Sequence, residues 1–353
     1  MGRSQSRARV DGALVAPPTL LAGCAALVAL AVVLGVGIGA VRIAPWDTVR
    51  ILLGHAGLAT SVDQQQDAIL WAIRLPRVLL GILVGGALAV SGAALQGIFR
   101  NPLADPTIVG VASGASVGAV AAILLGLSGA VYGGIQLAAF VGGMIAVLVV
   151  YALARQDGRT ETVTLVLVGV AVTAIAGAAV GLMIASADDD ELRDIVFWSL
   201  GSVGGATWTL VLATAPFVAV GAAAALTQTR ALDLLSLGER EAAHLGVEVE
   251  RVRILLVVAL ALATSAAVAA AGIVAFIGLI VPHVIRLVGG PSHRVVLPAR
   301  FLAGGAAVAL ADLVARTVVT PVELPLGVVT ALVGGPLFLW LVLRTRQRHG
   351  GWA

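Results

Sequence analysis

The chain is 353 residues long, 59% hydrophobic and 12% charged, and it contains 43 glycines. Its mean hydropathy of +1.05 lies outside the range of soluble globular domains and is typical of a multispanning membrane protein. The formal net charge is +3 and aromatic residues make up 4% of the chain. Without a compact basic patch interleaved with aromatic residues, the sequence predicts no nucleic-acid partner.

The ionisable residues exclude several kinds of site. Cys24 is the single cysteine, which excludes an intrachain disulfide and a thiolate metal cluster. The five histidines are scattered, and none lies four residues from another with a carboxylate nearby, so we predict no metal site. All 22 basic residues are arginines, and a Walker A loop requires a lysine. We therefore predict no cofactor on this chain, and any ATP must be bound, with its Mg²⁺, by another subunit.

Apolar runs divide the chain into ten candidate membrane spans, because about 20 apolar residues cross a hydrocarbon core. The first run follows an arginine-containing start, Met1 to Arg9, and is longer than a signal-peptide core, so we interpret it as an uncleaved span. The spans are predicted near 20–41, 68–99, 108–126, 135–154, 163–185, 209–227, 254–271, 273–288, 297–319 and 327–343. The fold class is therefore all-α, with one polytopic domain over 20–345 between tails at 1–19 and 346–353.

The arginines predict the orientation of the chain. If the amino terminus is cytoplasmic, only six of the 22 arginines fall outside: Arg42, Arg50, Arg74, Arg77, Arg193 and Arg316. Cytoplasmic loops of membrane proteins carry an excess of basic residues. The sequence thus predicts a multi-pass protein of a bacterial cytoplasmic membrane with both termini in the cytoplasm.

Two blocks of the chain, spans two to five and spans seven to ten, share a pattern. Each begins at flanking arginines and later breaks an apolar helix at a Gly-to-Pro segment, at 97–102 and at 278–282. An offset of five spans gives the blocks opposite orientations. Inverted repeats with interrupted helices are characteristic of transporters.

One motif imitates a hydrolase. Residues 114–118 satisfy G-x-S-x-G around Ser116, and His283 and Asp312 complete a triad on paper. The hydrolase motif needs a strand before its serine, whereas Gly110, Gly114 and Gly118 have the four-residue spacing that lets helices pack closely. We predict helix packing here, no catalytic residue, and for His283 a helix C-terminal cap or interface position.

A charged segment, Arg230 to Arg253, interrupts the apolar sequence. It has helical periodicity and places apolar side chains among charges, as an exposed interface helix does. These side chains are Leu232, Leu235, Leu237, Ala242, Ala243 and Leu245. The segment predicts a docking surface for a soluble partner, and the alternative is a solvated loop.

Several blocks resemble the FecCD family, the permeases of ABC importers for ferric siderophores, haem and cobalamin. They are Arg74-Leu75-Pro76-Arg77, residues 96–106 (QGIFRNPLADP) with the following GVASG, 197–202 (FWSLGS), 238–246 (GEREAAHLG), 272–283 (GIVAFIGLIVPH) and 323–330 (ELPLGVVT). They occur in family order, and the resemblance runs from about residue 20 to 345. It implies a type II ABC importer permease architecture with inverted repeats.

The resemblance implies a coupling loop at about 229–253, folded into short helices that sit in a cleft of an ABC ATPase dimer. The residues that match it are Asp233, Leu235, Gly238, Glu239, Glu241, Ala242, His244, Leu245 and Gly246.

The resemblance also implies docking of an extracytoplasmic substrate-binding protein on Arg74, Arg77 and Arg316, whose guanidinium groups would meet its glutamates. One alternative is that these side chains snorkel at span ends. For Arg316 another is a pair with Asp312, four residues away on the same helix.

Cytoplasmic gates are implied at Asn101, Leu103, Glu161 and Thr162. Pro102 and Pro106 would fix the shape of the first gate, and an ordinary interhelical turn is the alternative. Glu161 departs from the small hydroxyl residue expected at the second gate.

Together these features predict the permease subunit of an ATP-driven importer for an iron chelate, haem or a ferric siderophore. The resemblance implies a passage between two permease copies, with spans five and ten as walls. The alternatives are a cobalamin permease and an ion-coupled secondary transporter. The latter needs an intramembrane ionisable group, for which Asp312 is the one candidate.

Overall fold

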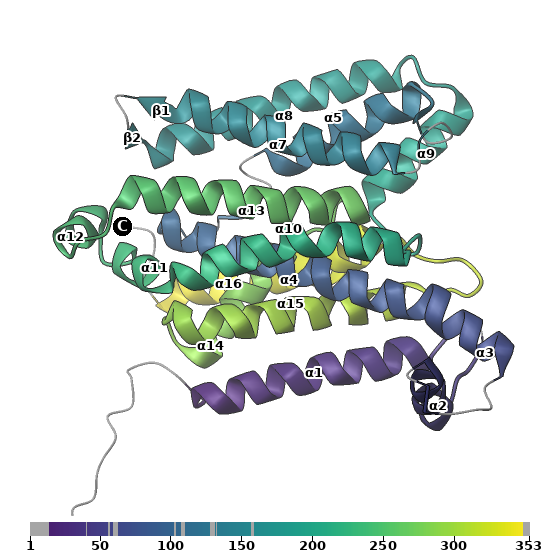
Figure 1. The fold of residues 1–353 in the computed structure, drawn as a ribbon. Coiled ribbons are helices and arrows are strands. Elements are labelled where there is room, and N and C mark those ends of the chain that lie inside the picture. Colours follow the sequence, from purple (N-terminus) through teal and green to yellow (C-terminus); the bar gives the residue numbers. More distant parts are fainter. Residues whose placement is uncertain are drawn as a thin grey trace, which may run out of the picture.

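The computed structural model describes residues 14–39, 41–55, 57–58, 63–101, 104–106, 110–127, 131, 133–156 and 159–348. Long helices lie side by side, and short elements connect them at two opposite ends (Figure 1). In chain order the elements are α1 (Pro17–Gly37), α2 (Pro45–His55), α3 (Gln64–Ala68), the π-helix η1 (Ile69–Arg74), α4 (Leu75–Ile98), α5 (Val111–Leu124), α7 (Gly134–Ala154), β1 (Arg155–Gln156), β2 (Arg159–Thr160), α8 (Thr162–Ile184), α9 (Asp189–Leu200), α10 (Trp208–Thr227), α11 (Thr229–Leu235), α12 (Glu239–His244), α13 (Val249–Ala271), α14 (Ile277–Gly289), α15 (His293–Ala315) and α16 (Leu326–Arg348).

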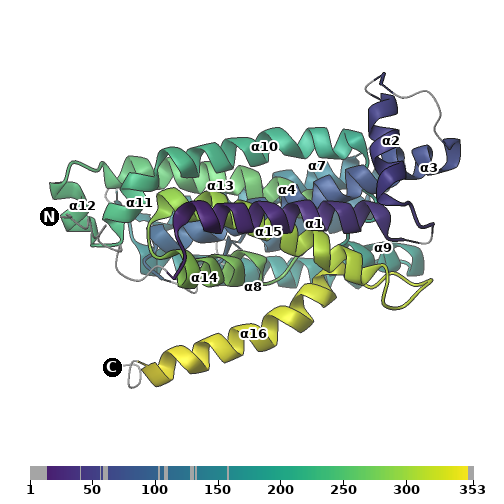
Figure 2. The ribbon, with the colours of Figure 1, turned by 90° about the horizontal axis from the view of Figure 1, so that it is seen from below.

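The predicted spans are confirmed in number and approximate position among the described residues. Seven helices are long and apolar enough to cross a membrane, and three shorter apolar helices, Val111–Leu124, Ile277–Gly289 and Leu326–Leu341, correspond to spans three, eight and ten. Figure 2 shows α16 leaving the other helices at an angle.

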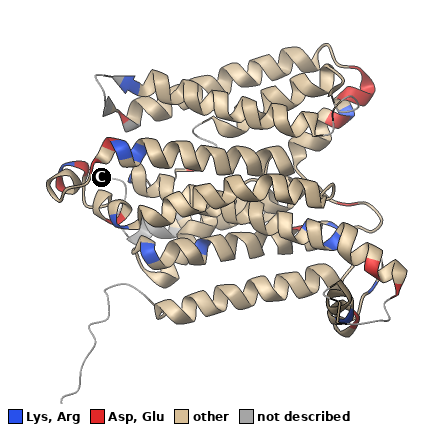
Figure 3. Cartoon of the chain, in the orientation of Figure 1, with Lys and Arg blue, Asp and Glu red and all other residues tan. Residues whose placement is uncertain are grey.

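Charged residues gather mainly at the two ends of the bundle (Figure 3). One end, here called the α3 end, carries α2, α3 and α9, and the other, the α12 end, carries α11, α12 and the antiparallel pair β1–β2. The six arginines predicted to share one side all belong to elements or connections of the α3 end. The grouping of these six arginines at one end therefore agrees with the prediction.

Helix α4 forms the centre of the bundle and is buried along most of its length. Its glycines let neighbouring backbones approach closely, as small residues do between membrane helices. A Cβ atom on Gly85 would lie 2.0 Å from the carbonyl oxygen of Gly304, and one on Gly92 would lie 1.8 Å from that of Gly278. No larger side chain fits at either position unless α14 or α15 moves.

The two predicted helix breaks have different outcomes. Helix α4 ends at Ile98, as predicted for 97–102, but Pro282 lies inside α14 and the break at 278–282 is wrong. The interruption falls earlier, between Gly272 (φ 68°) and Phe276 (φ 65°), which both adopt positive φ. His283 is consequently in the middle of α14 and is not its C-terminal cap.

The orientations of the two blocks agree with an inverted repeat. Helix α4 begins at the α3 end, whereas α13 begins at the α12 end (Figure 1). The Ser116 motif is helical, as predicted, since its Oγ donates to the carbonyl of Ala112 at 2.9 Å. Gly114 and Gly118 pack on the α7 backbone, where added Cβ atoms would lie 2.4 Å from Gly142 O and 2.1 Å from Ala138 O.

Candidate functional site

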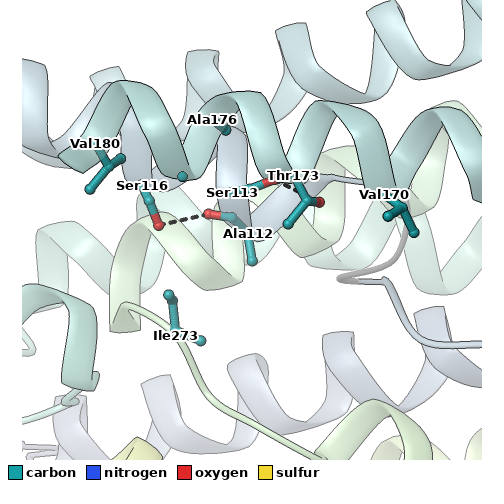
Figure 4. Close-up of a pocket in the computed structure, with 9 residues that line it drawn as sticks. Ala112, Ser113, Ser116, Val170, Thr173, Ala176, Val180 and Ile273 are labelled. Atoms are coloured by element: carbon teal, nitrogen blue, oxygen red, sulfur yellow. Dashed lines mark hydrogen bonds between the residues drawn. The ribbon is translucent and has the colours of Figure 1, made fainter. Parts of the chain in front are cut away.

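A groove of about 530 Å³ lies between α5 and α8, and Ile273 of the extended segment before α14 closes one side (Figure 4). Its polar groups are hydroxyls. Ser113 Oγ donates to the carbonyl of Gly110 at 3.0 Å and lies 3.3 Å from Thr173 Oγ1. The remaining lining residues are small or apolar: Ala112, Ser116, Val170, Ala176, Gly177 and Val180. Such walls offer weak contacts and no charge to a molecule in the groove.

The groove wall α8 presents an uncovered apolar surface. Five of its side chains are more than 60% exposed: Val163, Leu167, Val170, Ile175 and Leu182. An apolar surface of this extent faces either lipid or another protein chain.

At the α12 end, the predicted charged segment folds into α11 and α12. Asp233 of α11 caps the first turn of α15 from outside that helix, because one carboxylate oxygen accepts from His293 N at 2.8 Å and from His293 Nδ1 at 2.7 Å. Burial raises the pKa of Asp233, but the hydrogen bonds from His293 outweigh it and hold the pKa of this carboxyl below its ordinary value. Asp233 thereby fixes α11 to the bundle.

The apolar side chains of the segment divide into two sets, which corrects the prediction that all of them face outward. Leu232, Leu235 and Ala242 are buried within the chain, because helices of seven and six residues need tertiary packing to form. Leu237 and Leu245 remain exposed, at 63% and 56%. Ala243, Glu241, His244 and Gly246 are exposed beside them.

Two glycines of this segment have conformations that other residues rarely adopt. Gly238 (φ 143°) precedes α12 and Gly246 (φ 85°) follows it, and positive φ favours glycine. Between them, the carboxylate of Glu239 is half-exposed and pairs with Arg253 of α13. These positions set the shape of the segment and leave Leu237, Glu241 and Leu245 among its accessible side chains.

The three predicted docking arginines share the α3 end, but their side chains are bound within the chain. Arg77 Nε contacts both carboxylate oxygens of Asp312, at 3.1 and 3.0 Å, and Arg77 also pairs with Glu323. Arg316 Nε lies 3.7 Å from Asp312 Oδ2, so the ion pair named as the alternative for this residue is present. Arg74 donates to the carbonyls of Val36, Gly37 and Val41.

Asp312 is thus a structural counter-ion for two arginines, with a side chain 4% exposed. Sequence reasoning missed its pairing with Arg77, since 235 residues separate the two. Glu323 is more accessible, with half of its side chain exposed. The hydrogen bonds from Arg77 hold the pKa of Glu323 below its ordinary value.

The described residues of the predicted gates lie at the α12 end. Asn101 is exposed and follows α4, while Leu103 lies outside the described residues. Glu161 is the N-cap residue of α8 and accepts from Thr164 Oγ1 at 2.7 Å. Thr162 begins α8, and its side chain lies outside the described residues. The charged segment and the first turn of the groove wall therefore share one end of the bundle.

Within the described ranges, no group of three His, Cys, Asp or Glu side chains could hold a metal ion. Cys24 is a buried free thiol.

An all-α bundle whose described residues include ten apolar helices, with a hydroxyl-lined groove and charge gathered at its ends, defines a polytopic membrane transport protein. The FecCD transport family matches residues 27–344. The chain belongs to this family.

Curated relatives and a solved structure agree with that assignment. The chain is 46% identical over 303 residues to the cobalamin import system permease protein BtuC of Halobacterium salinarum, covering 86% of this chain and 80% of that protein. It is 41% identical over 296 residues to the hemin transport system permease protein HmuU of Yersinia pestis, covering 83% and 88%. An inward-facing structure of a metal-chelate type ABC transporter superposes with a TM-score of 0.82 at 32% identity, covering 93% of this chain and 99% of that one.

Proposed function

We propose that this chain is the permease subunit of an ATP-driven importer that carries an iron chelate, haem or a ferric siderophore, across a bacterial cytoplasmic membrane. The observation that carries the proposal is the uncharged groove beside α8 in a chain of the FecCD family. A bulky chelate needs a wide passage that binds it weakly, and the small and hydroxyl side chains of the groove provide such walls.

A second copy of the chain would complete the passage. Helix α8 lines the groove and also exposes five large apolar side chains, so a symmetric contact would cover this surface and enclose the groove between copies. We assign the second wall to α16, which leaves the bundle and exposes Leu332, Val333 and Leu339. A homodimer is the simplest assembly with these properties.

The two ends of the bundle would meet different partners. An ABC ATPase dimer, which binds ATP and Mg²⁺, would dock on α11 and α12 at the cytoplasmic side, against Leu237, Glu241 and Leu245. A substrate-binding protein would dock at the α3 end, where Arg77 and Glu323 lie. Both termini would then be cytoplasmic, since α1 begins and α16 ends at the α12 end.

Transport would proceed by alternating access. ATP binding in the partner would move α11 and α12, and the first turn of α8, with Glu161 and Thr162, would open or close the groove. ATP and the chelate each change the populations of the open and closed states only through the difference in their affinity for the two states. The permease itself performs no covalent chemistry, and its residues orient, enclose and release the chelate.

Cobalamin is the second candidate cargo, favoured by the 46% identity to a cobalamin permease. The test is uptake into vesicles that contain the permease, its ATPase and its binding protein. We expect ATP-dependent uptake of haem or a ferric siderophore and little uptake of cobalamin at equal concentration. Preferential uptake of cobalamin would replace the iron-chelate assignment.

A further inference from the structure

A buried arginine connects the α12 helix to the groove wall. Arg253 belongs to α13 and its side chain is 3% exposed. Its Nη2 donates to Glu239 Oε1 of α12 at 2.5 Å, and its Nη1 donates to the carbonyl oxygen of Thr160 at 2.9 Å. One guanidinium group therefore holds two segments that are not adjacent in sequence.

Glu250, one turn before Arg253 on α13, completes the connection. Its Oε2 accepts from Arg253 Nη1 at 3.1 Å, and its Oε1 accepts from Tyr151 Oη and from Thr160 Oγ1, both at 2.7 Å. Thr160 is thus held through its backbone and its hydroxyl, and Tyr151 fixes the end of α7 beside it.

The position of Thr160 connects these hydrogen bonds to the start of α8. Thr160 pairs with Arg155 in β1–β2, and the next two residues, Glu161 and Thr162, cap and begin α8. A continuous set of hydrogen bonds therefore runs from α12 through Arg253 to Thr160, two residues before the first residue of α8.

A neighbouring ion pair on α13 differs from the Arg253 contacts in its exposure to solvent. Arg251 and Glu248 have the same i, i+3 spacing as Arg253 and Glu250, but their side chains are 81% and 63% exposed. Exposed pairs contribute little and break easily. Separating a buried arginine from its carboxylates leaves an uncompensated charge and is strongly unfavourable, so the buried Arg253 resists separation from Glu239 and Glu250 together.

We propose that Arg253 is the positioning residue that transmits a displacement of α12 to the first turn of α8. This inference rests on the proposed function, in which α12 faces the ATPase and the start of α8 gates the passage. A planar guanidinium with several fixed donors suits the task, whereas a lysine ammonium is a compact point charge on a flexible stem. Lysine at this position keeps the charge but cannot hold Glu239 and Thr160 in one rigid geometry.

The test uses the complete complex of permease, ATPase and binding protein in vesicles. The variants are Glu239→Gln, which weakens the link to α12, and Arg253→Lys, which keeps the charge. The matched control is Arg193→Lys, since Arg193 pairs with Asp190 at the same i, i+3 spacing on α9, at the opposite end. ATP hydrolysis and chelate uptake are measured on the same vesicles. In a Cys24→Ala background, Val163→Cys at the start of α8 reports nucleotide-dependent maleimide labelling.

We expect both test variants to keep most of the ATP hydrolysis and to lose uptake per ATP by about tenfold, within the range typical of coupling between sites. The nucleotide-dependent change in maleimide labelling at residue 163 should decrease together with uptake, and Arg193→Lys should behave as wild type.

The proposal is overturned if both variants keep the wild-type ratio of uptake to ATP hydrolysis and the wild-type change in labelling. It is also overturned if hydrolysis and uptake fall in equal proportion. If Arg253→Lys fails to assemble, Glu239→Gln alone decides by the same two criteria. A wild-type permease that binds no ATPase would overturn the proposed function itself, before any variant is compared.

Discussion

The carboxylate of Glu323 accepts two hydrogen bonds from the guanidinium of Arg77, at 3.0 and 2.9 Å, across 246 residues of chain. Arg77 also holds the buried Asp312, so this arginine is fully paired when no partner is bound. If a binding protein docks here through a glutamate, that glutamate must compete with Glu323 for the same donors.

The first prediction concerns this competition. Glu323→Gln removes the competing charge, so we expect the binding protein to associate more tightly, by up to about fivefold, the equivalent of one exposed ion pair. Affinity is measured by surface plasmon resonance on the reconstituted permease. Asp190→Asn removes one negative charge at the same end without changing the contacts of Arg77. It therefore controls for the effect of overall charge on association. Equal affinities for wild type and Glu323→Gln would remove Arg77 from the docking surface.

A second prediction addresses the ATPase contact. Leu245→Asp places a charge on the exposed surface at the C-cap of α12, and we expect ATPase association to weaken by at least about tenfold, as for a central interface residue. Copurification and an ATPase titration measure it. Leu58→Asp is the control, because Leu58 is 75% exposed at the α3 end. Undiminished ATPase binding by Leu245→Asp would show that this surface is a solvated loop.

The third prediction uses the pH dependence of Asp233. Because hydrogen bonds from His293 lower the folded-state pKa of Asp233 despite its burial, ionised Asp233 stabilises the folded state above the pKa of the unfolded chain. That stabilisation disappears as the pH falls through the folded-state pKa. Asp233→Ala should therefore lower stability at neutral pH, by about 1 kcal/mol for a lost helix cap, and the difference from wild type should vanish in acid.

Thermal melting of the detergent-solubilised protein across this pH range measures the difference. Asp233→Asn, which keeps an acceptor for the backbone amide of His293, should lose less. A difference between wild type and Asp233→Ala that grew towards acid would contradict the assigned sign.

A fourth prediction places the passage. A Cβ atom on Gly177 meets nothing within 4 Å, so Gly177→Trp fits the fold and fills part of the groove. We expect the variant to assemble with its ATPase and to lose most chelate uptake, while Gly177→Ala retains it. Uptake by Gly177→Trp at the wild-type rate would show that cargo passes elsewhere.

The sequence predicted the helices well because the length and composition of an apolar run decide whether it spans a bilayer. It placed one break wrongly because Pro282 is accommodated inside α14, while the chain actually turns at Gly272 and Phe276. Proline restricts a helix, but the surrounding packing decides whether the helix ends.

The candidate site was only partly predictable. The charged segment was recognised as helical, yet the sequence could not show that Leu232, Leu235 and Ala242 face inward, since a short helix has too few turns to define a face. The pairing of Arg77 with Asp312 joins the start of α4 to the end of α15 and depends on the packing of those helices.

The energy source of transport tests the central claim most directly. Vesicles containing this chain alone, and vesicles containing it with its ATPase and binding protein, are loaded with ATP and supplied with labelled iron chelate. We expect accumulation against a gradient only in the complete complex, and only with hydrolysable ATP. Uphill accumulation by the chain alone, driven by an ion gradient, would contradict the account.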